Sequence, residues 1–190
     1  YGCAPLALAD DGPRMDASFD TTYRPDGVMS DGDDIGGEGW RLEAVHTPGH
    51  TSNHLCYALN GTQALFTGDH VMGWSTSVVS PPDGDMTAYM ESLTRLYERE
   101  DEVYFPAHGP QVDKTRQFVR GMIGHRRQRE NQIVRLMEQG VARIPDMVPQ
   151  MYKGVDQRLW PAAERSVLAH LIDLERKGRA TRTEDQWTTT

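Results

Sequence analysis

The sequence reads Val45-His46-Thr47-Pro48-Gly49-His50-Thr51 directly after a run, Trp40–Val45, in which apolar and polar residues alternate. An alternation with a period of two is typical of a half-buried β-strand. Pro48 lacks an amide donor and Gly49 tolerates a positive φ, so this pair ends the regular structure before it. We therefore expect a strand that runs into a tight turn on which His50 is displayed. Residues 36–39 are expected to form the turn that leads into this strand.

The same arrangement recurs twice further along the chain. The apolar run Ala64–Thr67 ends in Gly68-Asp69, and Val103–Phe105 leads into Pro106-Ala107-His108-Gly109. Leu55–Leu59 is a further expected strand, joined to Ala64–Thr67 by a hairpin at Asn60-Gly61. Because sites in α/β sheets gather at the carboxyl ends of strands, we expect His50, Asp69 and His108 to converge. Two imidazoles and a carboxylate suit zinc, manganese or iron better than calcium or magnesium.

The three motifs T-P-G-H-T, T-G-D and P-A-H-G, in this order, resemble those of the metallo-beta-lactamase superfamily of metallohydrolases. The resemblance implies an α/β protein with a four-layered αββα fold and a site for one or two metal ions. It also implies that His50 is a terminal ligand of one metal, Asp69 the bridging carboxylate, and His108 a terminal ligand of the second. Zinc is the expected cofactor, with manganese or iron as alternatives.

The family also carries an earlier motif, H-x-H-x-D-H, which is absent because no histidine precedes His46. We therefore expect a fragment that holds the second, carboxyl-terminal part of the αββα sandwich. Such a chain is expected to have a defective site and to be inactive by itself.

Other residues near these motifs are given different roles. His46 and His54 are expected to be structural or to support the site, and His70 is left out because the family's ligand at this turn is the adjacent Asp69. Trp74 lies on the Gly-, Ser- and Pro-rich loop 72–85 and is either a substrate platform or, as we prefer, a packing residue. Asp85 is expected to cap the next helix.

From Pro110 onward the sequence predicts helices. The pattern predicts a long helix over 113–139, a short one starting near 144, an amphipathic one over 161–177 and a wing strand in the tail. This order resembles the winged-helix appendage of one metallo-beta-lactamase branch, which includes mitochondrial beta-lactamase-like endoribonucleases and many bacterial hydrolases. We expect an incomplete metallo-beta-lactamase-fold domain at residues 1–112 and a winged-helix-like domain at residues 113–190. His170, within the last helix, is expected to be structural.

The net charge of −8 is divided unevenly. Residues 1–110 carry 5 Lys and Arg against 18 Asp and Glu, whereas residues 111–190 carry 15 against 10. The basic residues of the long helix are candidates for nucleic acid contacts, although acidic residues are interspersed among them and no aromatic stacking platform accompanies them. These basic residues are Lys114, Arg116, Arg120, Arg126, Arg127 and Arg129.

The expected chemistry is hydrolysis, in which the metals make hydroxide available near neutral pH to attack an ester, thioester or related bond. No catalytic residue beyond the metal ligands is predicted, and a small-molecule substrate is preferred. Two alternatives stay open: single-stranded RNA cleavage by the same fold, and a catalytically defective chain that binds a partner. No apolar run approaches the roughly 18 residues of a membrane span. Cys3 and Cys56 lack metal-type spacing, so both are expected to be reduced and the protein cytoplasmic.

Overall fold

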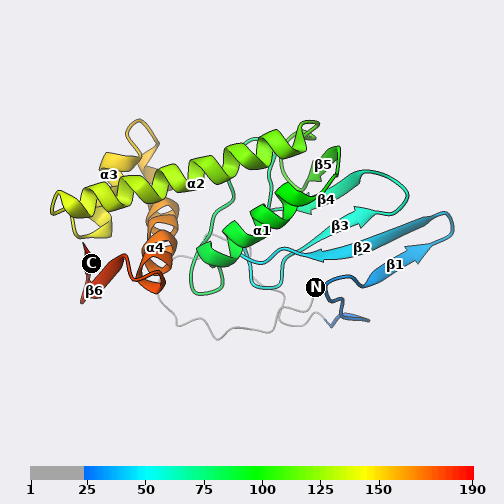
Figure 1. The fold of residues 1–190 in the computed structure, drawn as a ribbon, viewed down its shortest axis with the longest axis horizontal. Helices are drawn as coiled ribbons and strands as arrows, with labels where there is room; N and C mark the ends of the chain where they lie inside the picture. Colours follow the sequence, from blue (N-terminus) through cyan, green and yellow to red (C-terminus); the bar gives the residue numbers. More distant parts are fainter. Residues whose placement is uncertain (1–23) are drawn as a thin grey trace.

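The computed structural model describes residues 24–190, which form a five-stranded sheet, two helices packed on it and a smaller helical part at the carboxyl end (Figure 1). The sheet has the order β1-β2-β3-β4-β5. Its strands are β1 (Asp34–Gly37), β2 (Trp40–His46), β3 (Leu55–Leu59), β4 (Ala64–Gly68) and β5 (Val103–Pro106). The first four pair antiparallel, and β5 joins β4 in parallel. A parallel pair needs a crossover, which here contains the loop 72–85 and a helix.

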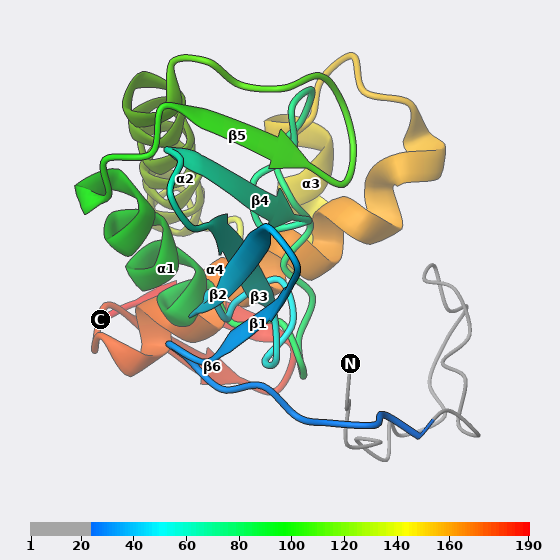
Figure 2. The ribbon, with the colours of Figure 1, turned by 90° about the vertical axis from the view of Figure 1, so that its right-hand side faces the viewer.

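The two faces of the sheet have different surroundings (Figure 2). One face carries Cys56, Leu65 and Tyr104, which are buried against the helices. The alternating positions Phe66 and Phe105 lie on the opposite face, partly exposed, with ring centroids 5.6 Å apart. The alternation of the strand sequence therefore sets which side chains contact helices.

The helices α1 (Met86–Glu98) and α2 (Thr115–Glu138) cover the buried face of the sheet. In α1 the apolar residues recur at intervals of three and four, which turns one stripe of the helix to the sheet. The buried members of this stripe are Met86, Tyr89, Leu93 and Leu96. The helix begins at Asp85, whose side chain accepts a hydrogen bond from the Ala88 amide at 3.0 Å, as predicted.

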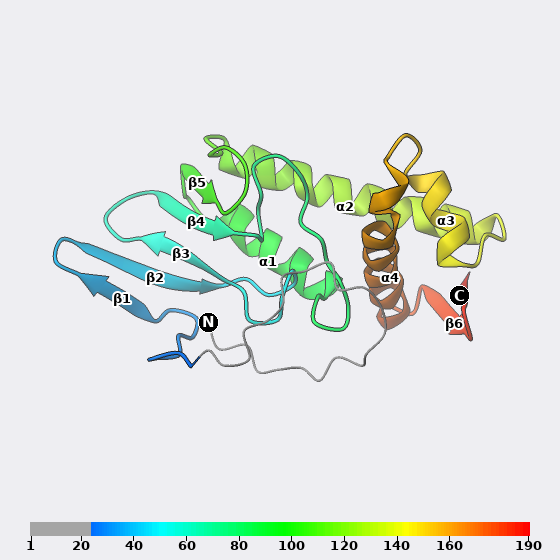
Figure 3. The ribbon, with the colours of Figure 1, turned by 180° about the vertical axis from the view of Figure 1, so that it is seen from behind.

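The carboxyl-terminal part contains α3 (Ile144–Met151), a short 3-10 helix η1 (Gln157–Leu159), α4 (Trp160–Arg176) and the hairpin of β6 (Ala180–Thr183) and β7 (Gln186–Thr189). It packs around a second apolar cluster that includes Trp187 of β7. The long helix α2 belongs to both clusters, since Val119 and Met122 contact the first and Ile133 and Leu136 the second. Seen from behind, α4 and β6 lie at the end of the molecule opposite the tips of the β1–β2 hairpin (Figure 3).

Most of the predicted elements are confirmed, including the strand before Pro48, the Asn60-Gly61 connection and the wing. The prediction that residues 36–39 are only a turn is wrong in part. Gly36 and Gly37 pair with β2 as the end of β1, and the turn is confined to Glu38-Gly39, where Gly39 has a φ of 80°. Backbone pairing with β2 thus extends the sheet through a glycine-rich segment whose side chains give no strand signal.

Three further predictions concern the chain as a whole. Cys56 is a free, buried cysteine, whereas Cys3 lies outside the described residues. No helix within residues 24–190 is long and apolar enough to cross a membrane. The division into domains at 112/113 and the cytoplasmic setting stay predictions.

Candidate functional site

Two of the three predicted ligands meet at one edge of the sheet. Asp69 follows β4 and His108 follows β5, and because these strands are parallel neighbours their carboxyl ends lie side by side. The Nε2 atom of His108 lies 3.4 Å from Oδ1 of Asp69. This Oδ1 atom is buried yet makes no hydrogen bond within the described part of the chain. A buried carboxylate oxygen without a hydrogen bond is unfavourable unless a cation or another donor compensates it.

The third predicted ligand, His50, lies on the turn after β2. Its Nδ1 atom donates to the carbonyl oxygen of Val78 at 2.6 Å, since a carbonyl can only accept. This leaves Nε2 as the acceptor nitrogen of the ring. Histidines that bind metals commonly donate their other ring N–H to such a carbonyl, so the orientation suits a ligand.

The three side chains do not, however, surround a single point. Within residues 24–190 no group of three or more His, Cys, Asp or Glu side chains is close enough to hold a metal ion. The donor types fit a divalent transition metal, and the Asp69–His108 pair with its unpartnered oxygen provides part of such a site. The assignment of His50, Asp69 and His108 as ligands stays a prediction.

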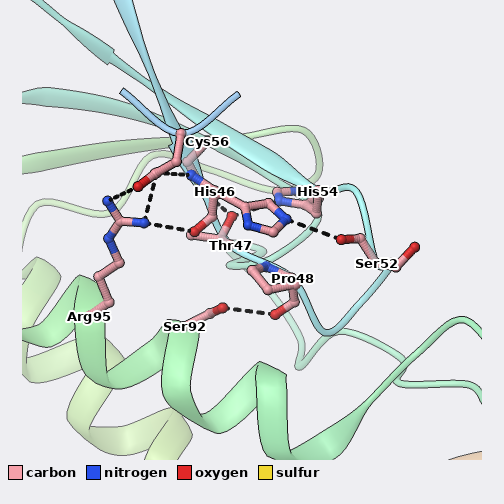
Figure 4. Close-up of polar contacts among 9 residues, drawn as sticks. His46, Thr47, Pro48, Ser52, His54, Cys56, Ser92 and Arg95 are labelled. Carbon is pink, nitrogen blue, oxygen red and sulfur yellow. Dashed lines mark hydrogen bonds and ion pairs between the residues drawn. The ribbon is translucent and has the colours of Figure 1, made fainter. Parts of the chain in front are cut away.

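The turn that carries His50 is held against α1 (Figure 4). Gly49 has a φ of 134°, and a Cβ atom there would lie 2.3 Å from the Cα of Tyr89. The Ser92 hydroxyl donates to the carbonyl of Pro48 at 2.8 Å. Arg95 donates to the carbonyl of His46 at 3.0 Å. The Pro-Gly pair therefore does more than end the strand, because its glycine allows the turn to touch the helix backbone.

His54 supports the backbone of Asp69. The amide of Asp69 donates to Nε2 of His54 at 3.2 Å, so Nδ1 carries the ring proton and donates to the Thr47 hydroxyl at 2.9 Å. The Thr47 hydroxyl in turn lies 3.2 Å from the Cys56 sulfur (Figure 4). Burial, with a smaller contribution from neighbouring His50, lowers the pKa of His54 to about 4. His54 is therefore neutral near pH 7 and able to accept from Asp69.

His70 lies next to Asp69 and packs between Tyr89 and His54, although the sequence pattern offered no reason to choose it over Asp69. Its ring is fully buried, with its centroid 4.5 Å from that of Tyr89 and 5.7 Å from that of His54. Neither ring nitrogen has a hydrogen-bond partner among the described residues, and burial lowers the pKa well below its usual value. The only available signal was its position directly after Asp69.

Trp74 does not pack as we preferred from the sequence. Its side chain is 70% exposed, and its ring stacks parallel to His108 with centroids 6.4 Å apart. The loop holds it there because Gly73 approaches Pro110 so closely that a Cβ atom would lie 2.1 Å from the Pro110 carbonyl oxygen. The Gly73 amide also donates to the His108 carbonyl at 2.9 Å. The preference for packing is wrong, and Trp74 borders the site instead.

Three arginines of α2 contact tyrosine rings of the protein. The guanidinium groups of Arg116, Arg126 and Arg129 lie over the rings of Tyr97, Tyr89 and Tyr152, at 5.3, 5.0 and 4.6 Å from the centroids. Arg126 is buried. Half of the six basic residues expected to face phosphates are thus in contact with aromatic rings of the protein, which weakens the argument for a nucleic acid surface.

Comparison with known proteins agrees with the geometry at the level of the family. The family model of the metallo-beta-lactamase superfamily matches residues 2–108, and that of the beta-lactamase associated winged helix domain matches residues 144–187. A beta-lactamase domain protein from Burkholderia ambifaria has a similar structure, with a TM-score of 0.76 at 21% identity, covering 90% of this chain and 53% of that one. This likeness shows the fold, and the predicted α/β class with a carboxyl-terminal winged helix is confirmed.

The matches to curated relatives cover a larger share of this chain than of the relatives' own sequences. The beta-lactamase-like protein 2 homolog of Drosophila melanogaster is 37% identical over 146 residues, which are 75% of this chain and 48% of that protein. The atrochrysone carboxyl ACP thioesterase of Aspergillus fumigatus is 34% identical over 115 residues, 59% of this chain and 35% of that protein. The chain thus spans about half the length, or less, of the curated relatives it matches. With the family model covering more than half of its residues, the chain belongs to the metallo-beta-lactamase superfamily.

Proposed function

We propose that this chain provides His50, Asp69 and His108 to the metal site of a hydrolase that acts on a thioester or ester. The observation that carries the proposal is the Asp69–His108 pair, in which a buried carboxylate oxygen without a hydrogen bond lies 3.4 Å from an imidazole nitrogen. His50 supports it, because its Nδ1 bond to Val78 leaves Nε2 as an acceptor. Zinc is the proposed metal, and manganese and iron accept the same donors.

A divalent metal held by these residues would lower the pKa of a water molecule and polarise the carbonyl of the substrate. Backbone and side-chain groups of the chain itself keep the ligands oriented. The carbonyl of Val78 orients the ring of His50, and neutral His54 accepts from the amide of Asp69. Trp74, exposed beside His108, is an apolar surface along which the arm of a thioester substrate can lie. The thioester is preferred because a relative named as an ACP thioesterase covers 59% of this chain.

The metal site is tested by titrating the chain with zinc in competition with a chromophoric chelator. We expect weak but saturable binding by the unchanged chain, since it lacks the H-x-H-x-D-H ligands, and affinity at least about tenfold weaker still for Asp69→Asn and His108→Ala, because each removes a donor. His46→Ala is the matched control, since His46 ends β2 just before the turn that carries His50, but its ring nitrogen bonds the Ser52 carbonyl at 3.1 Å. Absence of zinc binding, or equal loss in the His46 variant, would refute the site.

The substrate class is tested separately, because this chain has no H-x-H-x-D-H motif and we expect little turnover from it alone. A thioether analogue of an acyl-coenzyme A is titrated into the zinc-loaded chain. We expect binding that weakens several-fold for Trp74→Ala, because the substitution removes the exposed ring. Binding that is unchanged in this variant would contradict the role of Trp74.

RNA cleavage and partner binding through the winged helix stay predictions. The ring contacts of Arg116, Arg126 and Arg129 favour a small-molecule substrate over a polyanion. The acidic amino-terminal half would also repel RNA everywhere except close to the metals.

A further inference from the structure

Arg126 is a charged residue in an unusual place, because only 3% of it is exposed. It extends from α2, and its Nη2 donates to the carbonyl of Ser77. Its Nη1 lies 3.4 Å from the hydroxyl of Ser166 on α4, and its guanidinium carbon lies 5.0 Å from the centroid of the Tyr89 ring. These partners are oxygen dipoles and a ring rather than a carboxylate. A buried cation held in this way depends strongly on each of its contacts.

Both principal partners of Arg126 contact the turn that carries Asp69. The Ser77 hydroxyl donates to the carbonyls of Asp69 and His70. The Tyr89 hydroxyl donates to the carbonyl of His70 at 2.9 Å. The guanidinium is therefore linked through Ser77 to the carbonyls of Asp69 and His70, and through Tyr89 to the carbonyl of His70, the residue next to the proposed metal ligand.

The winged-helix part contacts the same region through α4. The Thr87 hydroxyl donates to Asp173 at 2.6 Å, and Arg176 forms an ion pair with Asp85. Asp85 and Thr87 lie where the loop after Asp69 enters α1. Together with the contact of Ser166 to Arg126, these contacts hold α4 against the end of the loop 72–85.

We infer that Arg126 is a positioning residue, which holds the Asp69–His70 turn through Ser77 and Tyr89 and couples the winged-helix part to the site. The effect of Arg126 on metal affinity rests on the proposed metal site, whereas the local ordering of the turn can be measured without a metal. Among the described residues, no hydrogen bond or ion pair joins Arg126 to His50, Asp69 or His108. Its guanidinium keeps Ser77 in place, and Ser77 keeps the carbonyl groups of the turn in the orientation that directs the Asp69 carboxylate toward His108.

The experiment compares Arg126→Gln with Arg129→Gln in the 190-residue chain. Arg129 is a matched control, because it also extends from α2, stacks over a tyrosine and donates to a carbonyl, that of Met151 at 2.8 Å. We expect zinc affinity to fall about tenfold for Arg126→Gln, the lower end of the effect of outer-shell partners, and to stay unchanged for Arg129→Gln. Equal affinities for the two variants would overturn the inference.

A second variant covers the case in which loss of the buried arginine unfolds the chain. Ser77→Ala removes only a hydroxyl and is expected to lower zinc affinity by a similar factor while the thermal unfolding temperature changes little. Unchanged zinc affinity in a folded Ser77→Ala chain would count against the inference.

Amide hydrogen exchange of residues 69–77, measured by mass spectrometry without metal, separates this inference from the proposed function. We expect faster exchange in this segment for Arg126→Gln or Ser77→Ala, and no local change for Arg129→Gln. If the unchanged chain binds no zinc but the exchange result holds, the proposed metal site fails and the positioning role stands. If exchange in the segment is unaltered, the positioning role fails whatever the metal affinity.

Discussion

His170 is the single residue whose protonation should matter most for stability outside the candidate site. It is 3% exposed within α4, and neither ring nitrogen has a hydrogen-bond partner among residues 24–190. Burial lowers its pKa to about 3, and neighbouring basic side chains on α2 and at the end of α4 add to the shift. These groups are Arg126, His125, Lys177 and Arg129. The sequence-based expectation that His170 is structural agrees with its burial.

The sign of the resulting pH dependence follows from the two states. In the unfolded chain His170 binds a proton near its ordinary pKa of 6.5, whereas in the folded chain it stays neutral down to about 3. Between these values the unfolded state binds more protons, so stability falls as the pH falls from about 6.5 toward 3. We expect His170→Leu to reduce this pH dependence by up to about 1.4 kcal/mol per pH unit. Urea unfolding of both proteins at pH 7.5 and pH 5 checks this, and equal losses of stability would contradict it.

At the scale of elements, the start of α1 depends on Asp85. One carboxylate oxygen accepts from the Ala88 amide, and the other forms the ion pair with Arg176 of α4. Asp85→Ala removes both, and we expect a loss of roughly 1 kcal/mol for the cap and less than about 1 kcal/mol for the half-exposed ion pair. Asp85→Asn keeps the cap and loses only the charge, so it should cost less. Chemical denaturation gives the free energy of unfolding of the unchanged chain, Asp85→Ala and Asp85→Asn. An Asn variant as unstable as the Ala variant would show that the ion pair contributes more than the cap.

At the scale of the whole molecule, α2 connects the two apolar clusters. Its first half packs with the sheet and its second half with the winged-helix part. A substitution that disrupts one cluster should therefore also destabilise the other. Trp187, 2% exposed in β7, is a core residue of the second cluster. We expect Trp187→Ala to destabilise the chain by about 3–5 kcal/mol. Residues of both clusters should lose hydrogen-exchange protection together.

The control for this prediction is Trp40→Ala in β2, because Trp40 is 49% exposed and lies outside both clusters. It should change stability much less. If Trp187→Ala lowered protection in the second cluster alone, α2 would not couple the two parts.

The sequence by itself determined the elements and the order of the motifs. Alternation before Pro48, apolar spacing in the helices and the Pro-Gly and Asn-Gly pairs are local properties, so Trp40–His46, α1 and the wing were predictable from neighbouring residues. The position of Asp69 and His108 after strands also followed, because parallel neighbouring strands bring their carboxyl ends to one edge. The pairing of Gly36 and Gly37 was missed, since glycine has no side chain to signal a strand.

Only the tertiary structure decided which residues surround these ligands. His54 reaches Asp69, Trp74 stacks on His108, and Arg126 reaches Ser77 across 49 residues of sequence. Such contacts depend on how the elements pack, which brings together side chains that are distant in the sequence. No local sequence pattern encodes this packing. The sequence grouped Arg126 with the basic residues that are candidates for nucleic acid contacts, whereas packing of α2 between α1 and α4 buried it. The reason is physical: periodicity acts within one element, but burial and hydrogen bonding are decided between elements.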